Sequence, residues 1–107
     1  MTRTKTDSMI DAKGLVDIDV LVPGSYTVRV PGWKRVTVNA EYYELAIAFI
    51  LAIKPRHRVS YRNFCWILGL DPTDKKYCHE WNVAVLVLEH RGEIARVRRG
   101  RPRWERL

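Results

Sequence analysis

The chain has no glutamine and only three asparagines, while its arginines outnumber its lysines by thirteen to six. Amide side chains are thermolabile, and their scarcity is a reported trait of proteins that work at high temperature. The composition therefore indicates a thermophilic source, either an archaeon or one of its viruses.

Long apolar runs and enzymatic motifs are also missing. No stretch of eighteen apolar residues occurs, so we expect no membrane-spanning helix. Residues 1–14 are polar and lack the apolar centre of a secretory signal, which predicts a flexible leader and a cytoplasmic protein. The sequence contains no phosphate-binding loop, dinucleotide-binding glycine motif, zinc-protease motif or nucleophile elbow. We therefore expect no enzymatic activity, no cofactor and no small-molecule ligand.

The chain has only two cysteines, Cys65 and Cys78. Zinc requires four ligands at suitable spacing, and the histidines at 57, 79 and 90 do not complete such a pattern. We therefore expect no metal site and assign both cysteines as free, buried thiols. A disulfide between them is the less favoured alternative, which the exceptional cytosols of hyperthermophiles would allow.

The residues that are present suffice for one folded domain with a basic end. The chain has 107 residues, of which 47% are hydrophobic, so it can bury a core. Its net charge is +7, and residues 91–107 alone hold seven arginines against two glutamates. Arginines concentrated on one element indicate a polyanionic partner. The alternative, a solvated tail, is weakened because Ile94, Val97 and Trp104 lie among these arginines.

Residues 15–38 alternate in the manner of β-strands. Apolar and polar residues alternate over 15–22, 26–30 and 34–38, which predicts three strands. Pro23 followed by Gly24 is typical of a type II turn. This β extension is expected either to lie against the helices or to form a dimerisation edge, and the sequence leaves both open.

A first helix is predicted over residues 41–53. Asn39 is a suitable N-cap, and Pro55 ends the helix. From Leu45 onward every residue is apolar, so the helix has no polar face and is expected to be buried on all sides. Its extra apolar surface would cover the β extension or a second subunit.

The remaining residues form a helix, a turn, a second helix and a basic ribbon. Ser60 is a good N-cap for a helix over 60–69, with a core face made by Phe64, Ile67 and Leu68. Gly69 permits the backbone conformation that ends it. A turn over 70–73 leads to a second helix over 74–91, for which Asp71 or Thr73 is the expected cap. Strands are predicted at 94–99 and 103–106.

This pattern resembles the winged helix-turn-helix family. The resemblance rests on segments 59–61 (VSY), 67–70 (ILGL) and 88–97 (LEHRGEIARV). It implies an α+β fold of three helices plus a C-terminal β-hairpin wing over residues 39–107, here preceded by the β extension. It also implies that Val59 pairs with the wing. Members of the family mostly bind double-stranded DNA, and some bind proteins.

The second helix of the motif would then be the recognition helix. Cys78, Trp81, Val85 and Leu88 recur at helical spacing and are assigned to the core. The opposite face would carry the residues that enter the major groove. These candidate DNA-binding residues are Lys75, Lys76, His79 and Asn82, with Val83 and Glu80 near the same face. Each of them has an ordinary surface role as the competing interpretation.

The ribbon supplies the second group of candidate DNA-binding residues. Arg99, Gly100, Arg101 and Pro102 are similar to the core of an AT-hook, which lies in the minor groove of AT-rich DNA. The alternative is a plain basic hairpin tip, in which Gly and Pro only shape the turn. Trp104 is expected to anchor the returning strand on the core rather than to stack on a base. Phosphate contacts are assigned to Arg96, Arg98, Arg103 and Arg106.

Together these features predict a double-stranded DNA-binding protein, a transcriptional regulator, that could form a homodimer. One alternative is a winged helix used for protein contacts in a transcription or replication assembly. The other is a nucleic-acid or chromatin binder without sequence preference.

Overall fold

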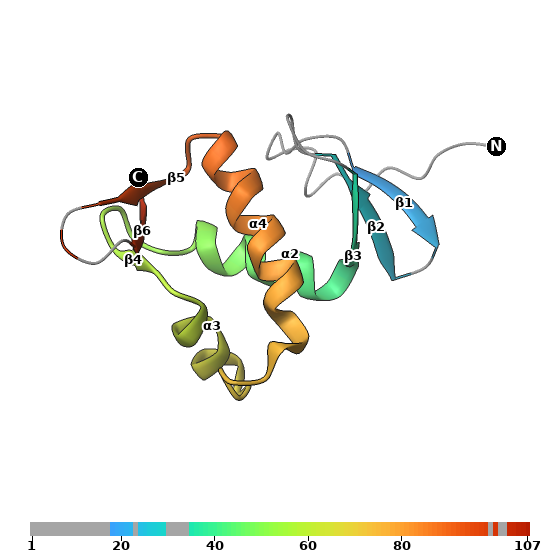
Figure 1. The fold of residues 1–107 in the computed structure, drawn as a ribbon, viewed down its shortest axis with the longest axis horizontal. Helices are drawn as coiled ribbons and strands as arrows, with labels where there is room; N and C mark the ends of the chain where they lie inside the picture. Colours follow the sequence, from blue (N-terminus) through green and yellow to red (C-terminus); the bar gives the residue numbers. More distant parts are fainter. Residues whose placement is uncertain (1–17, 23, 30–34, 99, 101–102) are drawn as a thin grey trace.

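The computed structural model describes residues 18–22, 24–29, 35–98, 100 and 103–107. Within these residues the chain is α+β, with three α-helices, one 3-10 turn and two three-stranded antiparallel sheets (Figure 1). In chain order the elements are β1 Ile18–Val22, β2 Ser25–Val28, β3 Val36–Asn39, α2 Ala40–Leu51, β4 Arg58–Val59, α3 Tyr61–Leu68, the 3-10 turn η1 Lys75–Tyr77, α4 Cys78–His90, β5 Ile94–Val97 and β6 Arg103–Arg106.

The first sheet has the order β1-β2-β3 and lies to one side of the helices (Figure 1). Gly24 adopts a φ of +87° between β1 and β2, as the expected turn requires. Tyr26, Val28 and Val38 point inward from β2 and β3 and belong to the same buried cluster as the helices. The β extension therefore packs on the helices, which was one of the two arrangements left open. The end of the strand predicted over 26–30 and the start of the strand predicted over 34–38 lie outside the described residues.

The helix α2 begins where β3 ends. The Asn39 side chain accepts a hydrogen bond from Tyr42 N at 3.1 Å, which confirms the predicted N-cap. Ala40 N donates to Gly24 O at 2.9 Å, so the turn between β1 and β2 also holds the start of the helix.

The prediction that α2 is buried on all sides is wrong. Tyr43, Ala46, Ile47 and Ile50 are buried. The opposite side is an exposed stripe of four residues: Glu41, Leu45, Ala48 and Ala52. Hydrophobicity alone did not reveal this side, because its exposed residues are mostly apolar as well.

The helix α3 begins and ends as predicted but buries a different face. Ser60 Oγ accepts a hydrogen bond from Asn63 N at 3.3 Å, and Gly69 ends the helix with a φ of +72°. Phe64 and Cys65 are buried, whereas Ile67 is 62% exposed and Leu68 is 39% exposed. The assignment of Ile67 and Leu68 to the core is wrong. On so short a helix, the apolar residues are compatible with either of two faces being buried.

The predicted second helix starts as a 3-10 turn, η1, before α4 begins at Cys78. Asp74 Oδ1 accepts a hydrogen bond from Lys76 N at 2.9 Å, so Asp74 is the cap, and the expectation that Asp71 or Thr73 would cap this helix is wrong. Asp71 instead accepts from both the backbone N and the hydroxyl of Thr73, at 2.9 and 2.8 Å. These two hydrogen bonds lower the pKa of Asp71 and shape the turn between α3 and α4.

Four aromatic side chains join the three helices. Phe64 of α3 lies 5.0 Å from Trp81 of α4 and 5.4 Å from Phe49 of α2, measured between ring centroids. Tyr61 lies 5.8 Å from Trp81. Aromatic pairs at such separations add to the free energy gained by burial.

The second sheet has the order β4-β6-β5. The hairpin of β5 and β6 follows α4 directly, and Gly92 makes the connection with a φ of +79°. Val59 of β4 pairs with Trp104 of β6, which confirms the predicted pairing of Val59 with the ribbon. Among the described helices, none is long and apolar enough to cross a membrane.

Candidate nucleic-acid interface

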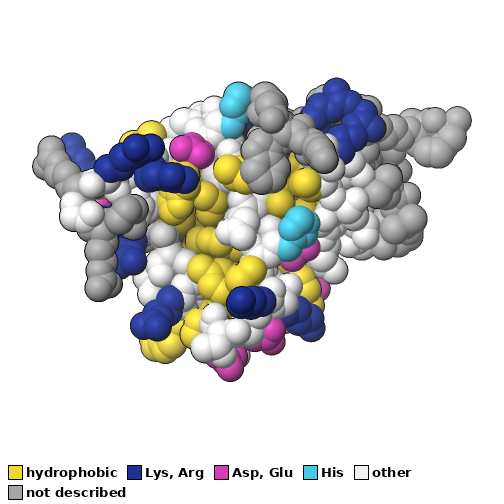
Figure 2. Space-filling view, viewed as in Figure 1, with side chains coloured by type: hydrophobic (Ala, Val, Ile, Leu, Met, Phe, Trp, Pro, Cys, Tyr) yellow, Lys and Arg dark blue, Asp and Glu magenta, His cyan; other side chains and the backbone are white. Residues whose placement is uncertain are grey.

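The exposed face of α4 carries little charge. Apart from Cys78 in the first turn, the exposed or half-buried residues of α4 are His79, Asn82, Leu86, Glu89 and His90. Figure 2 shows apolar and uncharged surface over the middle of α4, with basic side chains around its rim and beside the β5–β6 hairpin. Any attraction between this face and a polyanion therefore comes from its two ends.

Two residues near the start of α4 contact the N-terminal sheet instead of pointing freely into solvent. The His79 side chain is exposed, but its Nε2 lies 2.8 Å from Thr37 O of β3. Glu80 is only 7% exposed and accepts a hydrogen bond from Asn39 N at 2.9 Å. The sequence predicts that Glu80 lies near the exposed recognition face. That expectation is wrong, because the carboxylate is buried against the junction of β3 and α2.

Val83 was also placed near the exposed face, and it is buried. Of the four residues assigned to the core, Trp81, Val85 and Leu88 are buried, while Cys78 is half-buried. Asn82 is exposed, on the free face of α4. Of the two α4 residues assigned to the interface, His79 is thus the one that contacts the N-terminal sheet, and Asn82 faces solvent.

Lys75 and Lys76 lie in η1, at the N-terminal end of α4, and both are exposed. The ammonium group of Lys76 lies 5.8 Å from the ring centre of Tyr42 and 5.5 Å from that of Tyr77. The phenol groups of Tyr42 and then Tyr77 raise the pKa of Lys76, so it stays cationic. Lys75 has no such aromatic contact among the described residues.

The hairpin beyond the other end of α4 presents Arg96 and Arg98. Arg96 stacks on Trp104 with its guanidinium carbon 4.6 Å from the ring centre. Trp104 itself packs against the core, as predicted. A guanidinium stacked in this way keeps its edge available to bind an anion while its plane is fixed. Arg98 is exposed, just past the end of β5.

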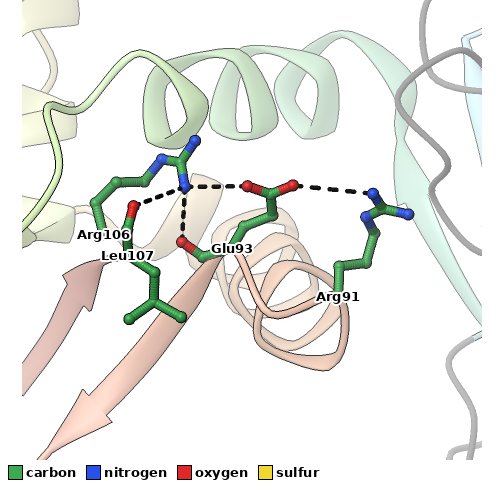
Figure 3. A network of polar contacts seen from close by, with 4 residues as sticks. All are labelled: Arg91, Glu93, Arg106 and Leu107. Atoms are coloured by element: carbon green, nitrogen blue, oxygen red, sulfur yellow. Dashed lines mark hydrogen bonds and ion pairs between the residues drawn. The ribbon is translucent and has the colours of Figure 1, made fainter.

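The two arginines of β6 have carboxylate partners. Arg103 Nε donates to Glu105 Oε2 at 2.8 Å, along the same strand. Arg106 Nη1 donates to the backbone oxygen of Glu93 at 2.8 Å and to its carboxylate at 3.0 Å. The Glu93 carboxylate also faces Arg91, at 3.8 Å (Figure 3).

Arg106 is therefore wrongly assigned as a phosphate contact. Its side chain is mostly buried, and it joins the end of β6 to the loop after α4 (Figure 3). The Glu93 and Glu105 carboxylates reduce the net charge at the base of the hairpin. The exposed arginines remain toward its tip.

The AT-hook-like tip is only partly described. Gly100 has a φ of +65°, a conformation that suits glycine. Arg99, Arg101 and Pro102 lie outside the described residues. Their assignment to the minor groove stays a prediction.

Cys65 and Cys78 are free thiols. Both lie near the hydroxyl of Tyr61. Burial, and then hydrogen bonding with these thiols, raises the pKa of Tyr61. Within the described part of the chain, no group of three or more His, Cys, Asp or Glu side chains is placed to hold a metal ion.

An apolar groove between α2 and α3 was not anticipated from the sequence. It measures about 580 Å³, and its lining includes Phe49, Ala52, Ile53, Trp66 and Ile67. Trp66 is 79% exposed. The sequence does contain one indication of this groove. Tyr61, Phe64 and Cys65 share one face of the helix, and Trp66 and Ile67 lie on the opposite face.

Comparison of the chain with protein-family models, characterised proteins and solved structures gave no match. Geometry and charge therefore carry the functional conclusion. The arrangement provides a helix with a nearly neutral exposed face, with Lys75 and Lys76 before its start and Arg96 and Arg98 beyond its end. Since α4 has thirteen residues, it is roughly 20 Å long and separates the two groups.

Proposed function

We propose that the chain is a winged helix-turn-helix protein that binds double-stranded DNA and regulates transcription. The observation that carries the proposal is the connection of α3, the turn and α4 to an antiparallel hairpin that also pairs with β4. On this proposal α4 is the recognition helix and the hairpin is the wing. Figure 2 supports it, because basic side chains beside the hairpin lie on the same face as α4.

The charges support contacts with both grooves. Lys75, Lys76 and Asn82 lie on η1 and the first turns of α4, the part of a recognition helix that reaches base edges. Arg96 and Arg98 lie on the hairpin, beyond the opposite end of α4. The neutral middle of α4 would approach the major groove without repulsion, while lysines and arginines neutralise phosphates on either side. Arg99 and Arg101 would enter the adjacent minor groove.

The first experiment measures binding of random and genomic duplexes over a range of salt concentrations. We expect one short preferred site and a salt slope that reflects several phosphate contacts. Lys75→Ala and Arg98→Ala should each weaken binding and reduce the slope by about one. Arg29→Ala removes the same charge just past β2 of the N-terminal sheet, where Arg29 is exposed, and should leave both quantities unchanged. Equal losses in all three variants would contradict the proposed interface.

The second experiment tests the wing tip. The double substitution Arg99→Ala and Arg101→Ala should weaken binding most on AT-rich probes, because narrow AT tracts concentrate negative potential in the minor groove. Equal loss on GC-rich probes would be consistent with phosphate contacts by these two arginines and would exclude their insertion into the minor groove. A steep salt slope without any preferred site would instead identify a binder without sequence preference.

A further inference from the structure

The exposed stripe of α2 has the spacing of a helix-packing surface. Glu41, Leu45, Ala48 and Ala52 are separated by four, three and four residues. This alternation lets one helix pack along another. Leu45 is 41% exposed, and the two alanines leave room for a second helix to approach closely. The stripe faces away from α4, which packs on the buried side of α2.

The surface beside this stripe has a projecting side chain at one end, at the edge of the larger groove, and a smaller hollow at the other. Near the C-terminal end of α2, Trp66 projects from α3 with 79% of its surface exposed. Near the N-terminal end lies a smaller hollow of about 160 Å³. Its lining residues are Tyr42, Leu45, Phe64, Leu68, Leu70 and Tyr77. Both features lie on the α3 side of the stripe.

The two ends also differ in charge. At the C-terminal end Lys54, Arg58 and Arg62 are exposed, and the described lining of the groove there includes no acidic residue. At the N-terminal end, three exposed acids outnumber two exposed lysines. These five residues are Glu41, Asp71, Asp74, Lys75 and Lys76. The surface is therefore complementary to itself when it is turned end to end.

We propose that a second copy of the chain covers this surface, with the two α2 helices antiparallel about a twofold axis. Leu45 of each copy then packs against Ala48 of the other, and Glu41 approaches the end that carries Lys54. The same rotation carries Trp66 of each copy over the hollow beside Tyr42 of the other. A twofold axis makes every such contact twice, which is the rule for isologous dimers.

Charge complementarity favours a second copy over an unrelated acidic peptide. A peptide would satisfy only the basic end, whereas the chain itself supplies both the acids and the bases. The proposal does not depend on DNA binding, and its test contains no nucleic acid.

Sedimentation velocity of the full chain over a dilution series measures the association. We expect a reversible dimer whose dissociation constant rises at least about tenfold in Leu45→Glu and in Trp66→Ala. Leu107→Ala removes an exposed apolar side chain just beyond β6 and should leave the dimer unchanged. Circular dichroism should show the native spectrum in all three variants. A wild-type chain that stays monomeric, or a dimer that persists in Leu45→Glu, would overturn the proposal.

A charge exchange tests the antiparallel arrangement itself. Glu41→Lys and Lys54→Glu should each weaken self-association, because each places like charges together. An equimolar mixture of the two variants should form a heterodimer more tightly than either variant pairs with itself. If mixing restores nothing, the antiparallel pairing is wrong. Restored association also shows that both variants are folded.

Discussion

Glu80 shows how one side chain can connect three elements. It lies in the first turn of α4, is almost fully buried, and accepts a hydrogen bond from Asn39 N. Asn39 is both the last residue of β3 and the N-cap of α2. The Glu80 carboxylate is buried, and its hydrogen bond with Asn39 N offsets part of the cost of that burial, so the contact stabilises the junction of the sheet with both helices.

We therefore expect Glu80→Ala to reduce the free energy of unfolding by about 1–3 kcal/mol. Glu80→Gln should cost less, because the amide oxygen can still accept the hydrogen bond. Chemical denaturation measures both values. Glu89→Ala, at an exposed position of the same helix, provides the matched control. A loss in Glu80→Ala no greater than in Glu89→Ala would show that the hydrogen bond does not stabilise the fold.

Two arginines of the hairpin have different environments, which their residue type alone does not predict. Arg98 and Arg106 were both assigned to phosphates from composition. Arg98 is exposed, whereas Arg106 is held by Glu93. Glu93 lies thirteen positions earlier in the chain. Only the return of β6 beside β5 brings that carboxylate within reach, so the sequence offered no local signal for the difference.

At the scale of the element, the contribution of each α3 side chain to stability depends on which face of the helix is buried. Phe64 is fully buried between α2 and α4, while Trp66, two residues later, is largely exposed. Both are large aromatic residues on one short helix. Their contributions to stability should therefore differ according to their contacts and not their size.

Phe64→Ala should destabilise the protein by about 3–5 kcal/mol, because it removes the ring that joins Phe49 and Trp81 and leaves a cavity. Trp66→Ala, in the same helix, should change the free energy of unfolding very little when measured on the monomer. Thermal or chemical unfolding at low protein concentration gives both values. Comparable destabilisation by the two substitutions would contradict the assigned face of α3.

The caps of α2 and α3 were the most predictable parts of these elements. Asn39, Ser60 and Gly69 all have the roles expected of them. Caps depend on side-chain chemistry within three or four residues, so local sequence determines them. Which face of α3 is buried, and which side of α2 is exposed, depends on residues far away in the sequence. Local sequence patterns carry no information about those residues.

At the scale of the whole molecule, the N-terminal sheet and the helices share one core. Tyr26, Val28 and Val38 lie in the same buried cluster as Ile50 and Leu88. The Tyr26 hydroxyl also donates a hydrogen bond to Glu44 of α2. The sheet is therefore part of the structural unit that positions α4.

The proposed dimer would orient its two α4 helices outward. The exposed face of α4 points away from α2, and α4 crosses in front of α2 in Figure 1. Two copies joined through the far side of α2 would consequently present the exposed faces of their α4 helices in opposite directions. Such a dimer suits two separate duplexes better than two adjacent half-sites on one duplex.

If both proposals hold, the wild-type chain should bring two duplexes together. Energy transfer between donor-labelled and acceptor-labelled duplexes should rise on adding the wild-type chain and stay at background with Leu45→Glu. Binding of a single duplex by Leu45→Glu should remain within about twofold of wild type per protomer, since Leu45 lies away from α4. Bridging that persists in Leu45→Glu would contradict this arrangement of the two helices.

The sequence by itself determined the order of the helices and strands, the caps of α2 and α3 and the basic character of the C-terminal hairpin. These follow from periodicity and from the chemistry of neighbouring residues. Tertiary structure alone decided that Glu80 and Arg106 are held by distant partners, and that Trp66 and the stripe of α2 face outward. Burial and pairing are properties of surfaces brought together by folding, and residues on those surfaces lie far apart in the chain.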